Sequence, residues 1–212
     1  MDFNITAMKQ RARIIMKDLK PSPFITILVI GLLMMIPYGG TIYCTRFVDK
    51  YMVFTMIITI VQGVLTGMVY VSYCWYSLAA VREERPGWKE AFGAFTQMPL
   101  KGLVTVVVKT VIISVLFMLC YVPGIIACYW LRPLEYIIKD NPELSIFHAI
   151  GKSVRMMKGH NLELLKLDIS FIGWYLLEIF TCMLGGIYAV PYAGFTYAEF
   201  YDYLKGQDEL YG

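Results

Sequence analysis

Several charged residues of this 212-residue chain fall inside stretches that are otherwise apolar, and Asp168 is among them, near the cytoplasmic end of its stretch. A charge within a bilayer is costly, so such residues pair with one another or face a cavity that carries an ion or a substrate. Arg132 and Glu135 are three positions apart, which places them on one face of a helix and predicts a local ion pair. Interhelical pairing in a small bundle and a polar cavity for a lipid headgroup or an ion are both compatible with this pattern. The intramembrane polar candidates are Lys109, Arg132, Glu135, Glu178 and Glu199.

A second set of candidate residues is basic and recurs at helical spacing. Between Pro142 and Lys158 the cations occupy one face and apolar residues another, a pattern typical of a helix lying in the membrane interface with its charges toward water or lipid phosphates. A solvated connector that only anchors topology is the alternative. The lipid-headgroup candidates are Lys9, Arg13, Lys17, His148, Lys152, Arg155 and Lys158.

Three segments are expected to form such surface helices. In residues 142–158, the run Asp140-Asn141-Pro142-Glu143 is typical of a helix start, and Lys158-Gly159 of a helix end. The N-terminal segment, 1–20, repeats the design. The weaker middle copy, 82–97, has an aromatic stripe. The apolar positions of these stripes are Ile5, Met8, Ala12, Ile15 and Leu19, then Trp88, Phe92 and Phe95, then Ile146, Ile150, Val154 and Met157.

The sequence contains no motif of an enzyme, a metal site or a cofactor site. The sequence has no Gly-x-Ser-x-Gly, no His-Glu-x-x-His and no phosphate-binding glycine loop, and its only histidines are His148 and His160. The cysteines are scattered without a Cys-x-x-Cys pair, so we interpret them as free thiols. We therefore predict no catalytic residue, no metal and no cofactor. The cysteines are Cys44, Cys74, Cys120, Cys128 and Cys182.

The composition places these residues on membrane helices. With 58% hydrophobic and only 17% charged residues, the chain has too little polar surface for a soluble protein. Gly63 and Gly67 are four residues apart, which permits close contact between two helices. We expect an all-α polytopic membrane protein with one domain, residues 1–212, in which six transmembrane helices form three hairpins, each preceded by an amphipathic helix on the cytoplasmic face. The expected spans are 24–44, 52–81, 102–122, 125–138, 162–184 and 187–204.

A local repeat supports the three hairpins. A proline in an apolar stretch is followed six residues later by a tyrosine in each of them. The short span at 125–138 leaves open a different arrangement, with four full spans and two re-entrant halves. The repeated pairs are Pro37 with Tyr43, Pro123 with Tyr129, and Pro191 with Tyr197.

The distribution of positive charge predicts the topology. Lysines and arginines gather in the N-terminal segment, in the second and third connections and in the tail, whereas the opposite side holds only Arg46 and Lys50. By the positive-inside rule both termini and all three amphipathic segments are cytoplasmic.

Several short runs in the second half of the chain resemble the signature blocks of the domain of unknown function 975 family, bacterial integral membrane proteins. The resemblance implies a bacterial cytoplasmic membrane location and six spans, and it implies no activity. More remotely, the family is similar to membrane domains attached to some glycerophosphodiester phosphodiesterases, but no catalytic domain accompanies the segments here. The runs are YVPGII (121–126), DNPE (140–143), MKGH (157–160), LDISFIGW (167–174), PY (191–192) and AEFY (198–201).

Three function classes follow from these features. The first, which we favour, is a non-enzymatic lipid-associated scaffold, chaperone or lipid-handling module. The second is a small transporter or channel-like protein that uses the intramembrane charges. The third is an immunity or accessory factor for an exported peptide. The expected partners are membrane lipids, including anionic phospholipid, with a homodimer or a partner membrane protein and no nucleic acid.

Overall fold

The described part of the chain is entirely helical in its regular secondary structure, which confirms the prediction of an all-α protein. Most of the first expected span, together with Cys44 and Tyr43, lies outside the described residues, and so does Cys182. The computed structural model describes residues 3–19, 23–26, 28–29, 48–84, 86–181 and 185–211.

The helices of the described ranges vary from single turns to elements of more than twenty residues. Their bounds are α1 (Ile5–Asp18), α3 (Val48–Val81), α4 (Trp88–Ala91), α5 (Gly93–Thr96), α6 (Pro99–Leu119), α7 (Tyr121–Trp130), α8 (Leu134–Asp140), α9 (Ile146–Met157), α10 (Asn161–Ile169), α11 (Ile172–Phe180) and α12 (Gly186–Tyr211).

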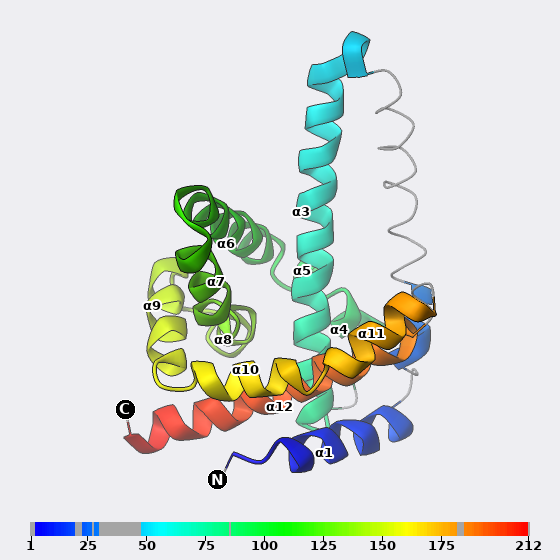
Figure 1. Ribbon diagram of the computed structural model, residues 1–212, viewed down its shortest axis with the longest axis vertical. Helices are drawn as coiled ribbons and strands as arrows, with labels where there is room; N and C mark the ends of the chain where they lie inside the picture. Colours follow the sequence, from blue (N-terminus) through cyan, green and yellow to red (C-terminus); the bar gives the residue numbers. More distant parts are fainter. Residues whose placement is uncertain are drawn as a thin grey trace.

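Two helices are long and apolar enough to cross a membrane, namely Met52–Val81 within α3 and Pro99–Leu119, which is α6. The two halves of α3 differ sharply in burial. Its first half projects from the rest of the molecule and exposes side chains such as Phe54 and Ile60, whereas Trp75 and Leu78 in its second half are buried (Figure 1). An apolar surface of this kind fits contact with lipid rather than water.

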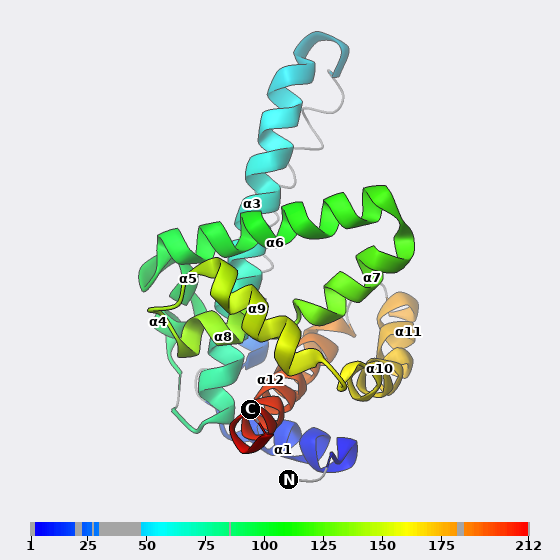
Figure 2. The same ribbon diagram turned by 90° about the vertical axis from the view of Figure 1, so that its left-hand side faces the viewer.

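α6 turns back into α7 but lies across α3 instead of beside it (Figure 2). The turn is close-packed, since a Cβ added at Gly124 would lie 2.5 Å from the ring of Phe117. The second and third expected spans are therefore both long helices, but they cross each other and do not run side by side.

Two expected spans are each divided into two helices. The span at 125–138 is divided into the end of α7 and α8, because Pro133 lacks the N–H of a continuous helix and its ring crowds the preceding turn. The span at 162–184 is divided between α10 and α11 at Ser170, whose hydroxyl donates to the carbonyl of Leu167 at 2.5 Å and competes with the helical backbone pattern. By contrast, α12 continues through Pro191.

Two of the expected surface helices also have different bounds. The middle segment is two single turns, α4 and α5, held against α3 by a hydrogen bond from the Ala94 N–H to the Ser72 hydroxyl, 3.0 Å long. The helix expected from Pro142 begins at Ile146, because the hydroxyl of Ser145 accepts from the backbone N–H of His148 and caps that turn.

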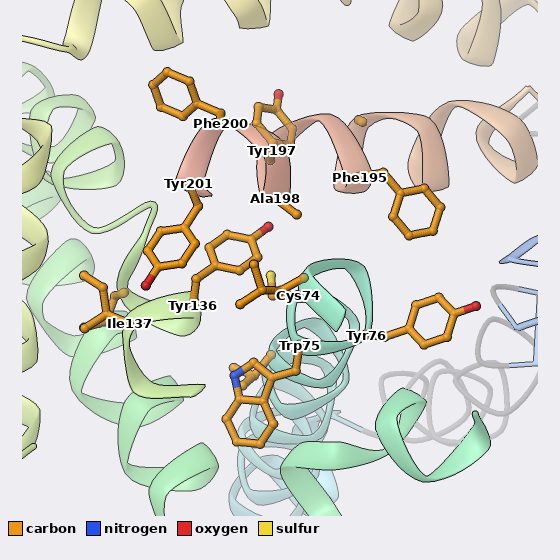
Figure 3. Packing of buried hydrophobic residues seen from close by; sticks show 14 of the residues in the cluster. Cys74, Trp75, Tyr76, Tyr136, Ile137, Phe195, Tyr197, Ala198, Phe200 and Tyr201 are labelled. Atoms are coloured by element: carbon orange, nitrogen blue, oxygen red, sulfur yellow. The ribbon is translucent and has the colours of Figure 1, made fainter. Parts of the chain in front are cut away.

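The core lies where the second half of α3 meets α8 and α12. Figure 3 shows Tyr136 of α8 beside Tyr201 of α12, and their rings stack with centroids 5.1 Å apart. Trp75 of α3 donates its indole N–H to the backbone carbonyl of Glu135 at 2.9 Å. Three helices that are distant in the sequence thus share one aromatic core, and this core sets the relative positions of the polar side chains that the helices carry.

We predict that the two glycines of α3 respond differently to substitution. A Cβ at Gly67 would overlap the side chain of Val106 on α6, whereas nothing lies within 4 Å of a Cβ at Gly63. Gly67→Ala should therefore lower stability by about 1 to 3 kcal/mol. Gly63→Ala, the matched control, should be neutral or stabilising by up to about 1 kcal/mol. Thermal unfolding of the purified protein in detergent measures both, and equal effects would contradict close packing of α3 on α6.

Candidate functional site

α1 runs antiparallel to α12 and packs against it. Next to the start of α1, the ring of Phe3 lies 5.7 Å from that of Tyr203. Beyond its end, the ring of Phe24 stacks on Tyr188, with centroids 5.8 Å apart. Both termini of the described chain therefore lie on one side of the molecule, as Figure 1 shows.

The apolar stripe of α1 faces the protein. The side chain of Asn4 caps the helix by accepting from the N–H groups of Thr6 and Ala7. The stripe positions Met8 and Ala12 are buried, and Met16, one further turn along, is buried with them. The sequence predicted this face correctly, but it is covered by other helices.

Lys9 contacts other parts of the protein and does not point into solvent. Its ammonium donates to the backbone carbonyl of Ser170 at 2.8 Å and lies 4.1 Å from the centroid of the Phe171 ring. Burial, with a smaller effect from the charge of Arg13, lowers the pKa of Lys9 below its usual value. This lysine therefore joins α1 to the break between α10 and α11, and it is not free to bind a headgroup.

The other two cations of α1 line a hollow, which we call the basic hollow, with a volume of about 230 Å³. The Arg13 guanidinium lies 5.2 Å from the centroid of the Tyr192 ring, and Lys17 is exposed. None of the described residues that line the basic hollow is a carboxylate. Its lining is Arg13, Met16, Lys17, Leu19, Phe24 and Tyr188.

α9 also turns its apolar side toward the protein core. Ala149, Ser153, Met156 and Met157 are buried, whereas the predicted apolar positions Ile146, Ile150 and Val154 are half-buried. Part of this helix therefore packs on the protein, and its interfacial position stays a prediction. The helix ends as predicted, since Gly159 follows it with φ +96°.

The four basic candidates of α9 have separate surroundings. His148 Nδ1 lies 2.8 Å from the hydroxyl of Ser145 at the helix start. Arg155 pairs with Asp208 of α12, with 3.3 Å between Nε and Oδ1. Lys152 is half-buried and Lys158 is exposed. The structure thus does not unite them in one site.

Glu135 pairs with Lys109 of α6 and not with Arg132, so the predicted local pair is wrong. The interruption at Pro133 removes the continuous helix on which the spacing argument depended. Glu135 is only 2% exposed, and its second oxygen has no hydrogen-bond partner among the described residues. This pair joins α6 to α8 in the interior.

Arg132 belongs to a different group. Its guanidinium lies 4.1 Å from the centroid of the Tyr197 ring. The hydroxyls of Tyr197 and Tyr129 donate to the two oxygens of Asp168, at 2.5 Å and 2.9 Å. These are the tyrosines that follow Pro191 and Pro123 by six residues, so the repeat was the sequence signal for this site, although it did not identify the carboxylate.

The remaining acidic candidates lie apart. Glu199 of α12 faces Arg11 of α1, with 3.6 Å between Oε2 and Nη1. Glu178 lies beside the turn at Gly186, where an added Cβ would be 2.6 Å from its Oε1. The five intramembrane candidates therefore occupy four different places and do not line one path.

Sequence reasoning missed a polar network at the end of α3. Arg82 donates to both oxygens of Asp140, at 2.6 Å and 2.9 Å, and to Asp202 at 2.6 Å. Lys205 adds a contact to Asp140 at 2.9 Å. The local sequence pattern predicted that Asp140 is part of a helix cap. Its partners Arg82 and Lys205 lie more than fifty residues away in the sequence, so no local pattern could indicate them.

Hydrogen bonding decides the charge of Asp140. Burial by itself would raise the pKa of this carboxyl group, but the hydrogen bonds from Arg82 and Lys205 outweigh that effect and lower the pKa to about 2. The hydrogen bonds from Arg82 to Asp140 and to Asp202 raise the pKa of Arg82. The network therefore remains ionised and links α3, α8 and α12.

The sequence pattern of the family described as "Protein of unknown function (DUF975)" matches residues 103–208, half of the chain. The chain belongs to this family. The match extends from within α6 to within α12, so it includes the Lys109–Glu135 pair and the group around Asp168 but not α1. No curated protein and no solved structure matches the chain.

For this DUF975 protein, we predict strong coupling between Lys109 and Glu135. Lys109→Met should lower stability by about 3 to 5 kcal/mol, because it leaves a buried carboxylate without its counter-charge. The double variant with Glu135→Gln should lose less than the sum of the two single losses. Lys101→Met, which removes another lysine of α6, is the control and should change stability by less than about 1 kcal/mol. Strictly additive losses in detergent unfolding experiments would contradict the coupling.

The network at Asp140 predicts a pH dependence. Because the pKa is lowered from 3.8 to about 2 on folding, the ionised carboxylate contributes stability that is complete above about pH 5 and is lost as the pH falls toward 2. Asp140→Asn should therefore cost about 2 kcal/mol at pH 7 and progressively less at acid pH. The control Asp208→Asn, which breaks a pair with an exposed arginine, should cost less than about 1 kcal/mol. A loss for Asp140→Asn that does not change with pH would disprove the assignment.

Proposed function

We propose that this protein is a non-enzymatic module of the bacterial cytoplasmic membrane that binds anionic phospholipid headgroups at the basic hollow. The observation that carries the proposal is that Arg13 and Lys17 both line this hollow, beside apolar and aromatic side chains, and that no carboxylate is among its described lining residues. Such a module would act as a scaffold, a chaperone or a lipid-handling protein.

The chemistry of the basic hollow suits a phospholipid. A guanidinium and an ammonium can pair with phosphate oxygens, and each cation close to an anionic surface contributes about 1 kcal/mol. Met16, Leu19 and Phe24 provide an apolar wall for the upper part of an acyl chain. A soluble anion would gain nothing from that wall, so the combination favours a lipid.

The proposal includes a multi-pass topology with both termini in the cytoplasm and six spans in three hairpins. It is supported by the two helices long and apolar enough to cross a membrane and by the clustering of basic residues. It is also supported by the proximity of the two chain ends, since Phe3 contacts Phe200 and Tyr203. The free apolar surface of α3 leaves room for a homodimer or a partner membrane protein.

A small transporter is the alternative, and the interior charges favour it less. Lys109 and Glu135 neutralise each other, and Asp168 receives two hydroxyl groups. The cavity beside Arg132 has a volume of about 10 Å³, which is room for one water molecule at most. In the described conformation these interior charges thus have separate protein partners and do not line an aqueous path.

The experiment compares two short-chain lipids binding to the full-length protein in detergent. Dihexanoyl phosphatidylglycerol should bind more tightly than dihexanoyl phosphatidylcholine, and the difference should shrink as salt is raised. Arg13→Gln with Lys17→Gln should weaken phosphatidylglycerol binding about tenfold to thirtyfold, since two cations are lost.

The matched control removes two cations outside the hollow, Lys89→Gln with Lys101→Gln, and should leave the affinity unchanged. Equal binding of the anionic and the zwitterionic lipid by the parent protein would end the proposal. So would equal losses in the two double variants, because the basic residues would then act only through overall charge.

A further inference from the structure

A second and larger hollow, which we call the α1–α12 cleft, lies at the other end of α1 and has a volume of about 400 Å³. That volume is within the range of sites that hold small molecules. Figure 1 shows α1 running along α12, so this cleft and the basic hollow lie at opposite ends of one helix pair. The residues used in the argument are Ala7 and Arg11 of α1 and Glu199, Asp202 and Tyr203 of α12.

The two carboxylates of the α1–α12 cleft differ in how their charge is compensated. Asp202 accepts from Arg82 at 2.6 Å and 3.2 Å. Glu199 has one ion pair among the described residues, with Arg11, and the separation of 3.6 Å is too long for a good hydrogen bond. The charge of Asp202 is thus compensated by Arg82, whereas Glu199 has no counter-charge at hydrogen-bond distance among the described residues.

Burial makes this difference significant. The side chain of Glu199 is 11% exposed, while that of Arg11 is 63% exposed. A long, exposed arginine gains little from an ion pair at this distance, but a carboxylate removed from water needs a close donor. Glu199 therefore presents an incompletely neutralised negative charge to a cleft with room for a ligand.

We propose that the α1–α12 cleft binds a primary ammonium group, with the carboxylate of Glu199 as its acceptor. An ammonium carries three N–H donors and can approach a carboxylate to about 2.8 Å. The ring of Tyr203, which packs against Phe3, forms part of the wall of the same cleft. A divalent metal ion fits less well, since it requires several oxygen ligands and Asp202 is already bound by Arg82.

The ammonium could come from the ethanolamine headgroup of a phospholipid or from a soluble amine. The headgroup places a phosphate near the ammonium, and the exposed Arg11 at the cleft can pair with that phosphate once it is displaced from Glu199. This site is separate from the basic hollow, and the inference does not depend on anionic lipid binding there.

The test measures binding of dihexanoyl phosphatidylethanolamine, dihexanoyl phosphatidylcholine and dihexanoyl phosphatidylglycerol to the full-length protein in detergent. The parent should bind phosphatidylethanolamine at least tenfold more tightly than phosphatidylcholine, whose methylated ammonium cannot donate a hydrogen bond. Glu199→Gln, which keeps the shape and removes the charge, should weaken phosphatidylethanolamine binding about tenfold and leave phosphatidylglycerol binding unchanged. Asp208→Asn, a carboxylate of α12 outside the cleft, is the control and should bind both lipids like the parent.

A steric variant guards against a folding defect in Glu199→Gln. Ala7 is exposed on α1 and lines the α1–α12 cleft, so Ala7→Trp should fill the cleft without changing any charge and should reduce phosphatidylethanolamine binding to a similar extent. Free ethanolamine distinguishes the sources. If free ethanolamine competes as well as the lipid, the ligand is a soluble amine. If only the lipid competes, the ligand is a lipid headgroup. Either result supports the ammonium site.

Two results would overturn the inference. One is that Glu199→Gln and Ala7→Trp both bind phosphatidylethanolamine like the parent. The other is that the parent binds phosphatidylcholine as tightly as phosphatidylethanolamine. Loss of phosphatidylglycerol binding alone would count against the basic hollow and would leave the ammonium site standing.

Discussion

The central constraint on this structure is that charges placed in an apolar interior must find partners, and most of these partners lie on helices distant in the sequence. Lys109 and Glu135 connect α6 to α8, and Arg82 connects α3 to α8 and α12. Lys9 reaches the carbonyl of Ser170 across the molecule. Because an unpaired buried charge costs several kcal/mol, each contact restricts how the helices can be arranged. Apolar packing alone would permit more than one arrangement of such similar helices.

Some elements could be predicted from the sequence because their signals are local. The all-α class follows from long apolar stretches, and the end of α9 at Gly159 follows from glycine's tolerance of a positive φ. The apolar face of α1 was found from its periodicity, and that of α9 only in part, since Met157 is buried but Ile150 and Val154 are half-buried. What covers those faces could not be found, because the same stripe suits a bilayer surface and a protein core. Here Met8 and Met157 are buried among other helices.

The polar sites were less predictable because their geometry depends on tertiary contacts. The spacing of Arg132 and Glu135 favoured a pair, but Pro133 interrupts the helix and directs the two side chains to different partners. The breaks at Pro133 and Ser170 also fall within apolar stretches whose average composition resembles a continuous span. The break at Pro133 has a local cause, whereas the break at Ser170 combines a local hydrogen bond to the Leu167 carbonyl with a distant one from Lys9 of α1.

The two tyrosines that bind Asp168 couple two similar parts of the chain through one carboxylate. Tyr129 and Tyr197 occupy equivalent positions in two of the three similar units of the sequence, and each takes one oxygen of the same carboxylate. A substitution at Asp168 would therefore disturb both units at once, so neither of them can change its tyrosine contact independently of the other.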